Sequence, residues 1–166
     1  AMKTHGTASR ADDTVASYSA KGPTAIDHIV KPDLVAPGNR IVSLLANTTT
    51  LKNKSNANLI PYSVYTTSTS SNFSTDYYRL SGTSMAAPMV SGAPALMIHK
   101  QPSLPPYHVK ARLIQPSPTT FPSYSTATDP VTGRTFNSQY DIFTIGAGYL
   151  NVWAALNSSD LATKPA

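Results

Sequence analysis

Ser84 is the residue of this sequence whose surroundings best suit covalent chemistry. It stands in LSGTSMAAPMVSG, residues 80–92, after Gly82 and Thr83 and ahead of a long apolar run. A serine hydroxyl is a weak nucleophile, so acyl transfer needs a base to take its proton and donors to hold the oxyanion. A helix N-terminus offers unpaired N–H groups and the positive end of the helix dipole. The pattern fits a nucleophile, and it also fits a serine that only caps a helix.

The four histidines do not supply an obvious base for that serine. His5 lies near the N-terminus and His28 lies between two predicted strands. His99 ends the helix predicted to begin at Ser84, and His108 belongs to the next predicted helix. No two of them are three or four residues apart, so a helical metal site is unsupported. We therefore predict no metal and no cofactor.

The composition excludes several kinds of site. Cysteine is absent, which rules out disulfides and thiolate metal sites. All eight acidic residues are Asp, so acid–base pairs built on Glu are excluded. The net charge of +5 comes from scattered Lys and Arg, whereas nucleic-acid surfaces cluster basic residues, so we predict no nucleic-acid partner. The longest apolar run, near residues 85–98, is too short to span a membrane, and no signal peptide is visible.

Short apolar strands and one apolar helix are expected to position the serine. We predict strands at residues 14–20, 33–36 and 41–45, and a buried helix over 84–99. Pro94 would fall inside this helix, so we expect a kink or an early break there. Strands buried on both faces beside an apolar helix predict an α/β fold of three layers with a mostly parallel sheet flanked by helices.

The remaining segments are predicted to be peripheral. A polar insertion at about residues 47–79 is expected to hold a hairpin completed by DYYRL, residues 76–80. Its tyrosines could stack on a ligand or pair across strands; they are Tyr62, Tyr65, Tyr77 and Tyr78. Downstream we predict a helix within 103–117 with Val109, Leu113 and Ile114 facing inward, a loop over 118–139, and a short helix capped by Asn151.

The longer string around Ser84 is similar to the active-serine segment of subtilisin-like serine proteases, the subtilase family. GTSMAAPMVSGAPAL, residues 82–96, resembles that family's Gly-Thr-Ser-Met-Ala-x-Pro segment. Three more strings resemble family segments in the same order: VASYSAKGPT (15–24), KPDLVAPG (31–38) and GAGYLNVWAAL (146–156). The resemblance implies that residues 1–166 are the C-terminal part of a subtilase catalytic domain.

Departures from the family pattern bear on packing and on the catalytic partners. Met89 stands where the family usually has His, and Pro94 where Ala is usual. The triad of subtilisin runs Asp, His, Ser along the chain, and no Asp-Ser/Thr-Gly segment occurs here. HGT at residues 5–7 resembles the family's His-Gly-Thr but directly precedes a predicted strand, so we interpret it as a false match. Both partners are expected upstream of residue 1, which leaves the Ser84 N–H and the Thr83 hydroxyl, on the turn at Gly82, as oxyanion contributors.

The resemblance implies a serine endopeptidase that cleaves peptides or proteins through an acyl-enzyme on Ser84, secreted or extracellular in bacteria. The chain alone is expected to be inactive because the serine has no base. Two interpretations remain open: a truncated piece of an active protease, or a non-catalytic interaction or complementing module. The expected partners are the missing N-terminal half and, through an open sheet edge and an uncovered helix, a second copy in a homodimer.

Overall fold

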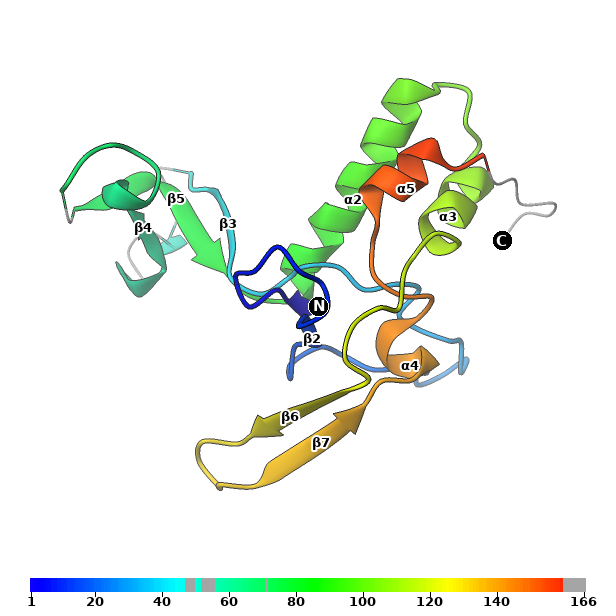
Figure 1. Cartoon of the computed structure of the whole chain (residues 1–166), viewed down its shortest axis with the longest axis horizontal. Helices are drawn as coiled ribbons and strands as arrows, with labels where there is room; N and C mark the ends of the chain where they lie inside the picture. The colour runs from blue at the N-terminus through cyan, green and yellow to red at the C-terminus, as the bar shows by residue number, and fades with distance from the viewer. Residues whose placement is uncertain (47–49, 52–55, 71, 160–166) are drawn as a thin grey trace. The chain divides into compact units, whose positions relative to one another are not determined.

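The chain divides into two compact units, residues 1–39 with 82–166, and residues 40–81. The structure, a computed structural model, describes residues 1–46, 50–51, 56–70 and 72–159. Helices and strands of both units are labelled in Figure 1. The first unit carries Ser84, and the second corresponds to the predicted polar insertion with its flanking strands.

Three helices pack together in the first unit (Figure 1): α2 (Thr83–Lys100), α3 (Pro106–Ile114) and α5 (Val152–Asn157). A fourth, α4, is a single turn at Ile142–Ile145. Small residues let α2 lie close to its neighbours. The core that they share is Ala1, Ala16, Ala36, Ala86, Ala93, Met97, Leu104, Val109, Leu113, Leu150 and Ala155.

The three predicted helices are confirmed, but two details of α2 were wrong. The helix continues through Pro94 to Lys100 instead of breaking. It is also not buried all round, because within the described chain it buries only Ala86, Ala93 and Met97. Met89, Leu96 and Ile98 are 42%, 50% and 46% exposed. An apolar pattern shows which surfaces a helix can bury, and here apolar side chains on two sides of α2 stay exposed among the described residues.

The predicted N-terminal strand region is shorter than expected. Residues 14–20 form only β2 (Thr14–Val15), which pairs antiparallel with β1 (Met2–Lys3). The predicted strand 33–36 forms isolated parallel bridges, Met2 with Pro37 and Val35 with Tyr149. Pro32 and Pro37 cannot donate to a ladder, which keeps this pairing short. The α/β character is present, while all the named strand pairs are antiparallel.

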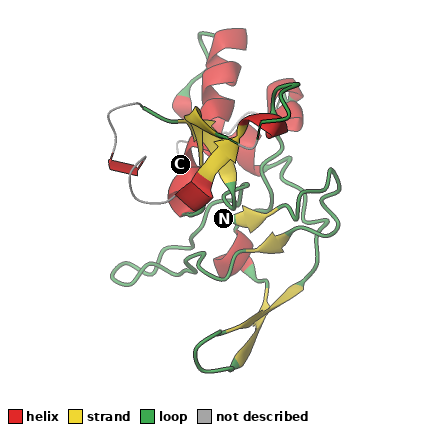
Figure 2. Cartoon of the chain, turned by 90° about the vertical axis from the view of Figure 1, so that its left-hand side faces the viewer, coloured by secondary structure: helices red, strands yellow, loops and turns green. Residues whose placement is uncertain are grey.

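The predicted loop over 118–139 is wrong, because it contains a hairpin. β6 (Tyr124–Thr128) pairs with β7 (Thr135–Gln139) in antiparallel register. Both views place this hairpin at the end of the first unit away from α2, α3 and α5 (Figure 2). Most of its side chains are exposed, so the apolar alternation of a half-buried strand is missing.

The second unit is a three-stranded antiparallel sheet in the order β3-β5-β4. Its strands are β3 (Ile41–Leu44), β4 (Leu59–Pro61) and β5 (Phe73–Leu80), with 3-10 turns at Asn56–Asn58 and Tyr62–Val64. The predicted strand at 41–45 and the hairpin completed by residues 76–80 are confirmed. Residues 47–49, 52–55 and 71 of the predicted insertion lie outside the described residues.

Tyrosine rings of the second unit contact one another, but these contacts lie within the 3-10 turn at Tyr62–Val64 and between that turn and β5, and not across a pair of strands. The ring of Tyr65 lies 4.9 Å from that of Tyr77 and 5.9 Å from that of Tyr62, between centroids. Tyr78 is buried and its hydroxyl accepts a hydrogen bond from Asn58.

In the described part of the chain, no helix is both long and apolar enough to cross a bilayer.

Candidate active site

Ser84 is the second residue of α2, an 18-residue helix that starts at Thr83 after the N-cap Gly82. The first four N–H groups of a helix lack intrahelical partners. The Gly82 N–H, the first of the four, donates to the Gly38 carbonyl at 2.8 Å, and the Met85 N–H, the fourth, donates to the Gly82 carbonyl at 3.1 Å. The N–H groups of Thr83 and Ser84 meet no acceptor in the described residues. They remain available at the positive end of the helix dipole.

The Ser84 side chain is exposed and its hydroxyl has no hydrogen-bond partner among the described residues. It therefore does not act as a side-chain cap, and the N-cap position is taken by Gly82, which makes no side-chain bond. Of the two interpretations of this serine, the capping one is wrong. A hydroxyl without internal bonds remains free to react.

The turn that carries Ser84 is fixed by the carbonyl of Gly38. This oxygen accepts the Gly82 N–H at 2.8 Å and the Tyr18 hydroxyl at 3.2 Å. The close approach of the segments at residues 38 and 82 needs glycine, because a Cβ on Gly38 would lie 2.8 Å from the Gly82 oxygen and 3.0 Å from the Ala86 Cβ. Three segments distant in sequence thus meet at the base of the serine turn.

The four histidines all lie away from Ser84. His5 Nε2 bonds the Thr14 hydroxyl at 2.8 Å, and the ring of His108 packs on Tyr107 with 4.4 Å between centroids. His99 is in the last turn of α2, about 22 Å along the helix from Ser84 at 1.5 Å per residue. His28 lies in the loop before the 31–38 segment. None of the four is within hydrogen-bond distance of the Ser84 hydroxyl, so the described residues place an exposed hydroxyl beside unpaired N–H groups but bring no imidazole to it.

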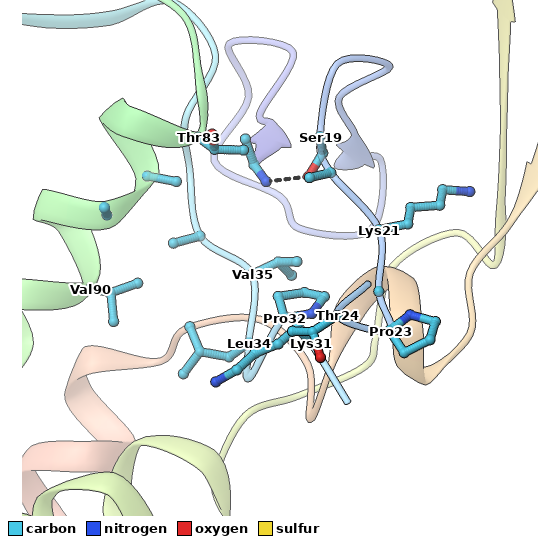
Figure 3. A pocket seen from close by; sticks show the side chains of 16 residues that line it. Ser19, Lys21, Pro23, Thr24, Lys31, Pro32, Leu34, Val35, Thr83 and Val90 are labelled. Atoms are coloured by element: carbon cyan, nitrogen blue, oxygen red, sulfur yellow. Dashed lines mark hydrogen bonds between the residues drawn. The ribbon is translucent and has the colours of Figure 1, made fainter. Parts of the chain in front are cut away.

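A cavity of about 350 Å³ lies beside the start of α2. Thr83 and Val90 of α2 face it from one side, and Ser19 and Pro32 face it from the other (Figure 3). The amino group of Ala1 donates to Ser19 Oγ at 2.8 Å, the bond drawn in that figure. Its walls are mostly apolar side chains, which suit an apolar segment better than a charged group.

Charged side chains near the cavity have structural roles. Asp33 accepts from Lys31 at 2.5 Å and is paired with Lys110 of α3 at 3.3 Å, joining the 31–38 segment to α3. The Lys31 hydrogen bond, with a smaller contribution from Lys110, holds the pKa of Asp33 below its usual value. In the described ranges no group of three or more His, Cys, Asp or Glu could hold a metal ion.

A second buried contact secures the loop before β2. Asp13 and Tyr149 are each 2% exposed, and Arg10 stacks 4.8 Å from the Tyr149 ring centroid. Burial, followed by the hydrogen bond with Asp13, raises the pKa of the Tyr149 hydroxyl above its usual value. Asp13 Oδ1 is buried and has no hydrogen-bond partner in the described chain.

A comparison with models of protein families matches residues 6–148 to the Subtilase family. The chain belongs to the subtilase family. The match contains the turn at Gly82, Thr83 and Ser84 as well as the Gly38 segment. The predicted family membership is thereby confirmed.

Among curated proteins, the subtilase chain is 37% identical over 113 residues to the serine protease AprX of Bacillus subtilis (strain 168), covering 68% of this chain and 22% of the relative. It is 33% identical over 144 residues to the subtilisin-like protease SBT1.6 of Arabidopsis thaliana, covering 86% of this chain and 16% of the relative. The chain thus spans about a fifth of the length of these relatives. The activity of a whole subtilase is therefore treated as a proposal for this chain.

Sequence reasoning missed Tyr18 and Gly38 as residues that support the subtilase serine turn. Both lay in strings that resemble the family, VASYSAKGPT and KPDLVAPG, but were interpreted only as strand and turn. An aromatic hydroxyl three residues after the short strand β2 was the available signal for Tyr18. Its partner could not be identified, because the contact joins two segments separated by a turn.

Proposed function

We propose that Ser84 is the nucleophile of a serine endopeptidase that cleaves peptide bonds through an acyl-enzyme. The observation that carries the proposal is the free Ser84 hydroxyl at the N-terminus of α2, beside the unpaired N–H groups of Thr83 and Ser84. A capping serine would have its hydroxyl engaged with the first turn. Membership of the subtilase family supports the same role.

The reaction follows from this arrangement. Ser84 Oγ bonds to the carbonyl carbon of the substrate while its proton passes to a base, and the carbonyl oxygen takes the negative charge. The Ser84 N–H, the Thr83 hydroxyl and the dipole of α2 stabilise that oxyanion, with Gly82 shaping the turn. The C–N bond then breaks, the base returns its proton to the leaving amine, and water hydrolyses the ester.

The base and the Asp that orients it are proposed to come from segments outside these 166 residues, in the order Asp, His, Ser of subtilisin. Support comes from the four histidines of this chain, none of which reaches Ser84. The chain alone is therefore proposed to be inactive. The complete catalytic domain is proposed to have three layers and a mostly parallel sheet, to which the parallel bridges at Val35 and Met2 would belong. It is also proposed to act outside the cell.

The test measures labelling of Ser84 by a fluorophosphonate probe. The chain alone should label slowly, and a longer polypeptide that also carries the Asp and His segments should label rapidly and stoichiometrically. Ser84→Ala should abolish labelling. Ser91→Ala should retain labelling. Ser91 is a serine of the same helix, and its hydroxyl bonds only the Ala87 carbonyl.

Two outcomes would contradict the proposal in different ways. Rapid labelling of the chain alone would show that a base exists within it. A folded longer polypeptide that turns over no peptide and does not label would show that Ser84 is not a nucleophile.

A second candidate function, a non-catalytic module that self-associates, is favoured by the uncovered face of α2. Met89 and Leu96 are exposed large apolar side chains seven residues apart, and therefore on the same side of that helix, and such patches mark association surfaces. We propose a homodimer across this face, since two identical faces can close by two-fold symmetry. Sedimentation should show a dimer that Leu96→Lys converts to monomer, whereas Ile26→Lys, at a 93% exposed site outside α2, should not. A monomeric wild type would refute the dimer.

A further inference from the structure

A second pocket of the first unit, of about 160 Å³, lies between β2 and the β6–β7 hairpin. β2 with the following segment to Lys21 forms one wall, and the hairpin forms the other. The lining residues include Ser17, Ser125 and Ser138 as well as Lys3 and Lys21. The proposed chemistry at Ser84 makes no use of this pocket.

Hydroxyl groups dominate the polar lining, and several of them are already bonded. Tyr140 accepts the Val15 N–H at 2.8 Å, Thr126 donates to Asn137 at 2.9 Å, and Thr14 bonds His5. The hydroxyls of three serines have no partner among the described residues; they are Ser17, Ser125 and Ser138. The pocket therefore offers three hydroxyl donors without an internal acceptor.

Two lysines, Lys3 and Lys21, complete the lining, and no Asp is among the lining residues. The ion pairs of the described chain are both formed with Asp33, by Lys31 and Lys110. The side-chain ammonium groups of Lys3 and Lys21 have no ion pair or hydrogen bond in the described residues. Figure 3 shows the Lys21 side chain extending away from the cavity beside Thr83.

The polar side chains of this pocket are mainly hydrogen-bond donors, and its charged groups are all positive. Hydroxyls and ammonium groups without internal acceptors are complementary to a ligand that accepts hydrogen bonds and carries negative charge. An ionised carboxylate is acceptor-only and fits a pocket of this size. Larger anions, such as nucleotides, exceed it.

The pocket also lies close to the serine turn along the chain. Ser17 and Ser19 line the pocket, and Tyr18 between them bonds the Gly38 carbonyl that receives the Gly82 N–H. One three-residue segment therefore contacts both the pocket and the support of the Ser84 turn. An extended peptide gains about 3.3 Å per residue, so a side chain a few residues from the scissile bond can reach the pocket.

We propose that this pocket binds the carboxylate of an acidic side chain of the peptide substrate, between Lys3 and Lys21. The substrate part of this inference rests on the proposed function of Ser84. The binding part can be measured without catalysis, on the chain itself.

The experiment follows backbone amide resonances of the labelled chain while a blocked tripeptide, Ala-Asp-Ala, is added. Saturable shifts are expected at Ser17, Ser125 and Ser138. The amide analogue Ala-Asn-Ala should bind at least about tenfold more weakly, because it lacks the charge that strengthens hydrogen bonds to ammonium groups. The double variant Lys3→Gln/Lys21→Gln should lower affinity for Ala-Asp-Ala by a similar factor.

The matched control is Lys31→Gln/Lys110→Gln, which removes the same charge from lysines that pair with Asp33. It should keep the affinity, and thermal melts should show both double variants folded. Equal binding of the Asn peptide, or equal loss in both double variants, would overturn the proposal. If binding holds but the longer polypeptide fails to label at Ser84, the carboxylate site stands and the protease proposal fails.

Discussion

Replacing Gly38 by Ala tests whether the carbonyl contact at residue 38 fixes the serine turn. The added Cβ would lie 2.8 Å from the Gly82 oxygen, 2.8 Å from the Ala1 Cβ and 3.0 Å from the Ala86 Cβ. Contacts this short must be relieved by moving backbone, since none of these atoms ends a flexible side chain. Overpacking of this kind costs about 1–3 kcal/mol, and we expect that loss in the free energy of unfolding.

The assay is urea unfolding followed by circular dichroism, with the midpoint and slope compared between variants. Gly92→Ala is the matched control, because it lies in α2 and a Cβ there meets no atom within 4 Å. That substitution should raise stability by roughly 0.5–1 kcal/mol through helix propensity. In the longer polypeptide, Gly38→Ala should also slow labelling of Ser84, while Gly92→Ala should not.

Two results would refute this reasoning. A Gly38→Ala chain as stable as the wild type would show that the segments at residues 38 and 82 separate without cost. A loss of equal size in Gly92→Ala would show that alanine on either segment acts by some route other than the close approach at Gly82.

Three further predictions concern single side chains. Ser84→Ala should leave the free energy of unfolding within about 0.5 kcal/mol of the wild type by urea unfolding, since the side chain is exposed and unbonded. Asn151→Ala should cost about 1 kcal/mol in the same assay, because Asn151 Oδ1 caps α5 by accepting the Ala154 N–H at 3.1 Å; an unchanged midpoint would contradict the cap. The pKa of Asp33 is lowered in the folded chain, chiefly by the Lys31 hydrogen bond. The resulting stabilisation is present above the unfolded-state pKa of about 4 and is lost as the pH falls through the lower pKa of the folded state. Between about pH 5 and pH 2, the free energy of unfolding should fall further for the wild type than for Asp33→Asn. Since Asp33 is partly exposed, this extra loss should stay below about 1 kcal/mol. Identical pH profiles would exclude the pair as a contributor.

Local signals allowed the position of the serine and its helix to be predicted from sequence. Gly82 and the apolar run after Ser84 mark a helix start, and the helix begins one residue from the predicted position. Asn151 likewise marks the start of α5, because a cap depends on residues only three apart. Such features need no knowledge of distant contacts.

Features set by distant contacts, or by their absence, were not predicted. The hairpin at Tyr124–Gln139 escaped detection because its half-buried positions hold the small residues Ser125, Ala127 and Ser138, so no apolar alternation marks its strands. The exposed side of α2 escaped detection for the opposite reason, since its sequence is that of a buried helix. The contact of Tyr18 with Gly38 joins separate segments, which composition and spacing do not reveal.

The hydrogen bond between Gly82 and Gly38 also has a consequence for how this region of the chain can vary. The second unit leaves the first after residue 39 and returns at residue 82, so its two ends are held together by that 2.8 Å bond and by the β3–β5 ladder, in which Ile41 pairs with Leu80. The entropy of closing a loop between fixed ends grows only slowly with loop length. Because loop closure contributes so little, the tolerance of residues 40–81 to insertion or exchange depends on the stability of their own three-stranded sheet, which makes this junction a place where another self-folding segment can be inserted.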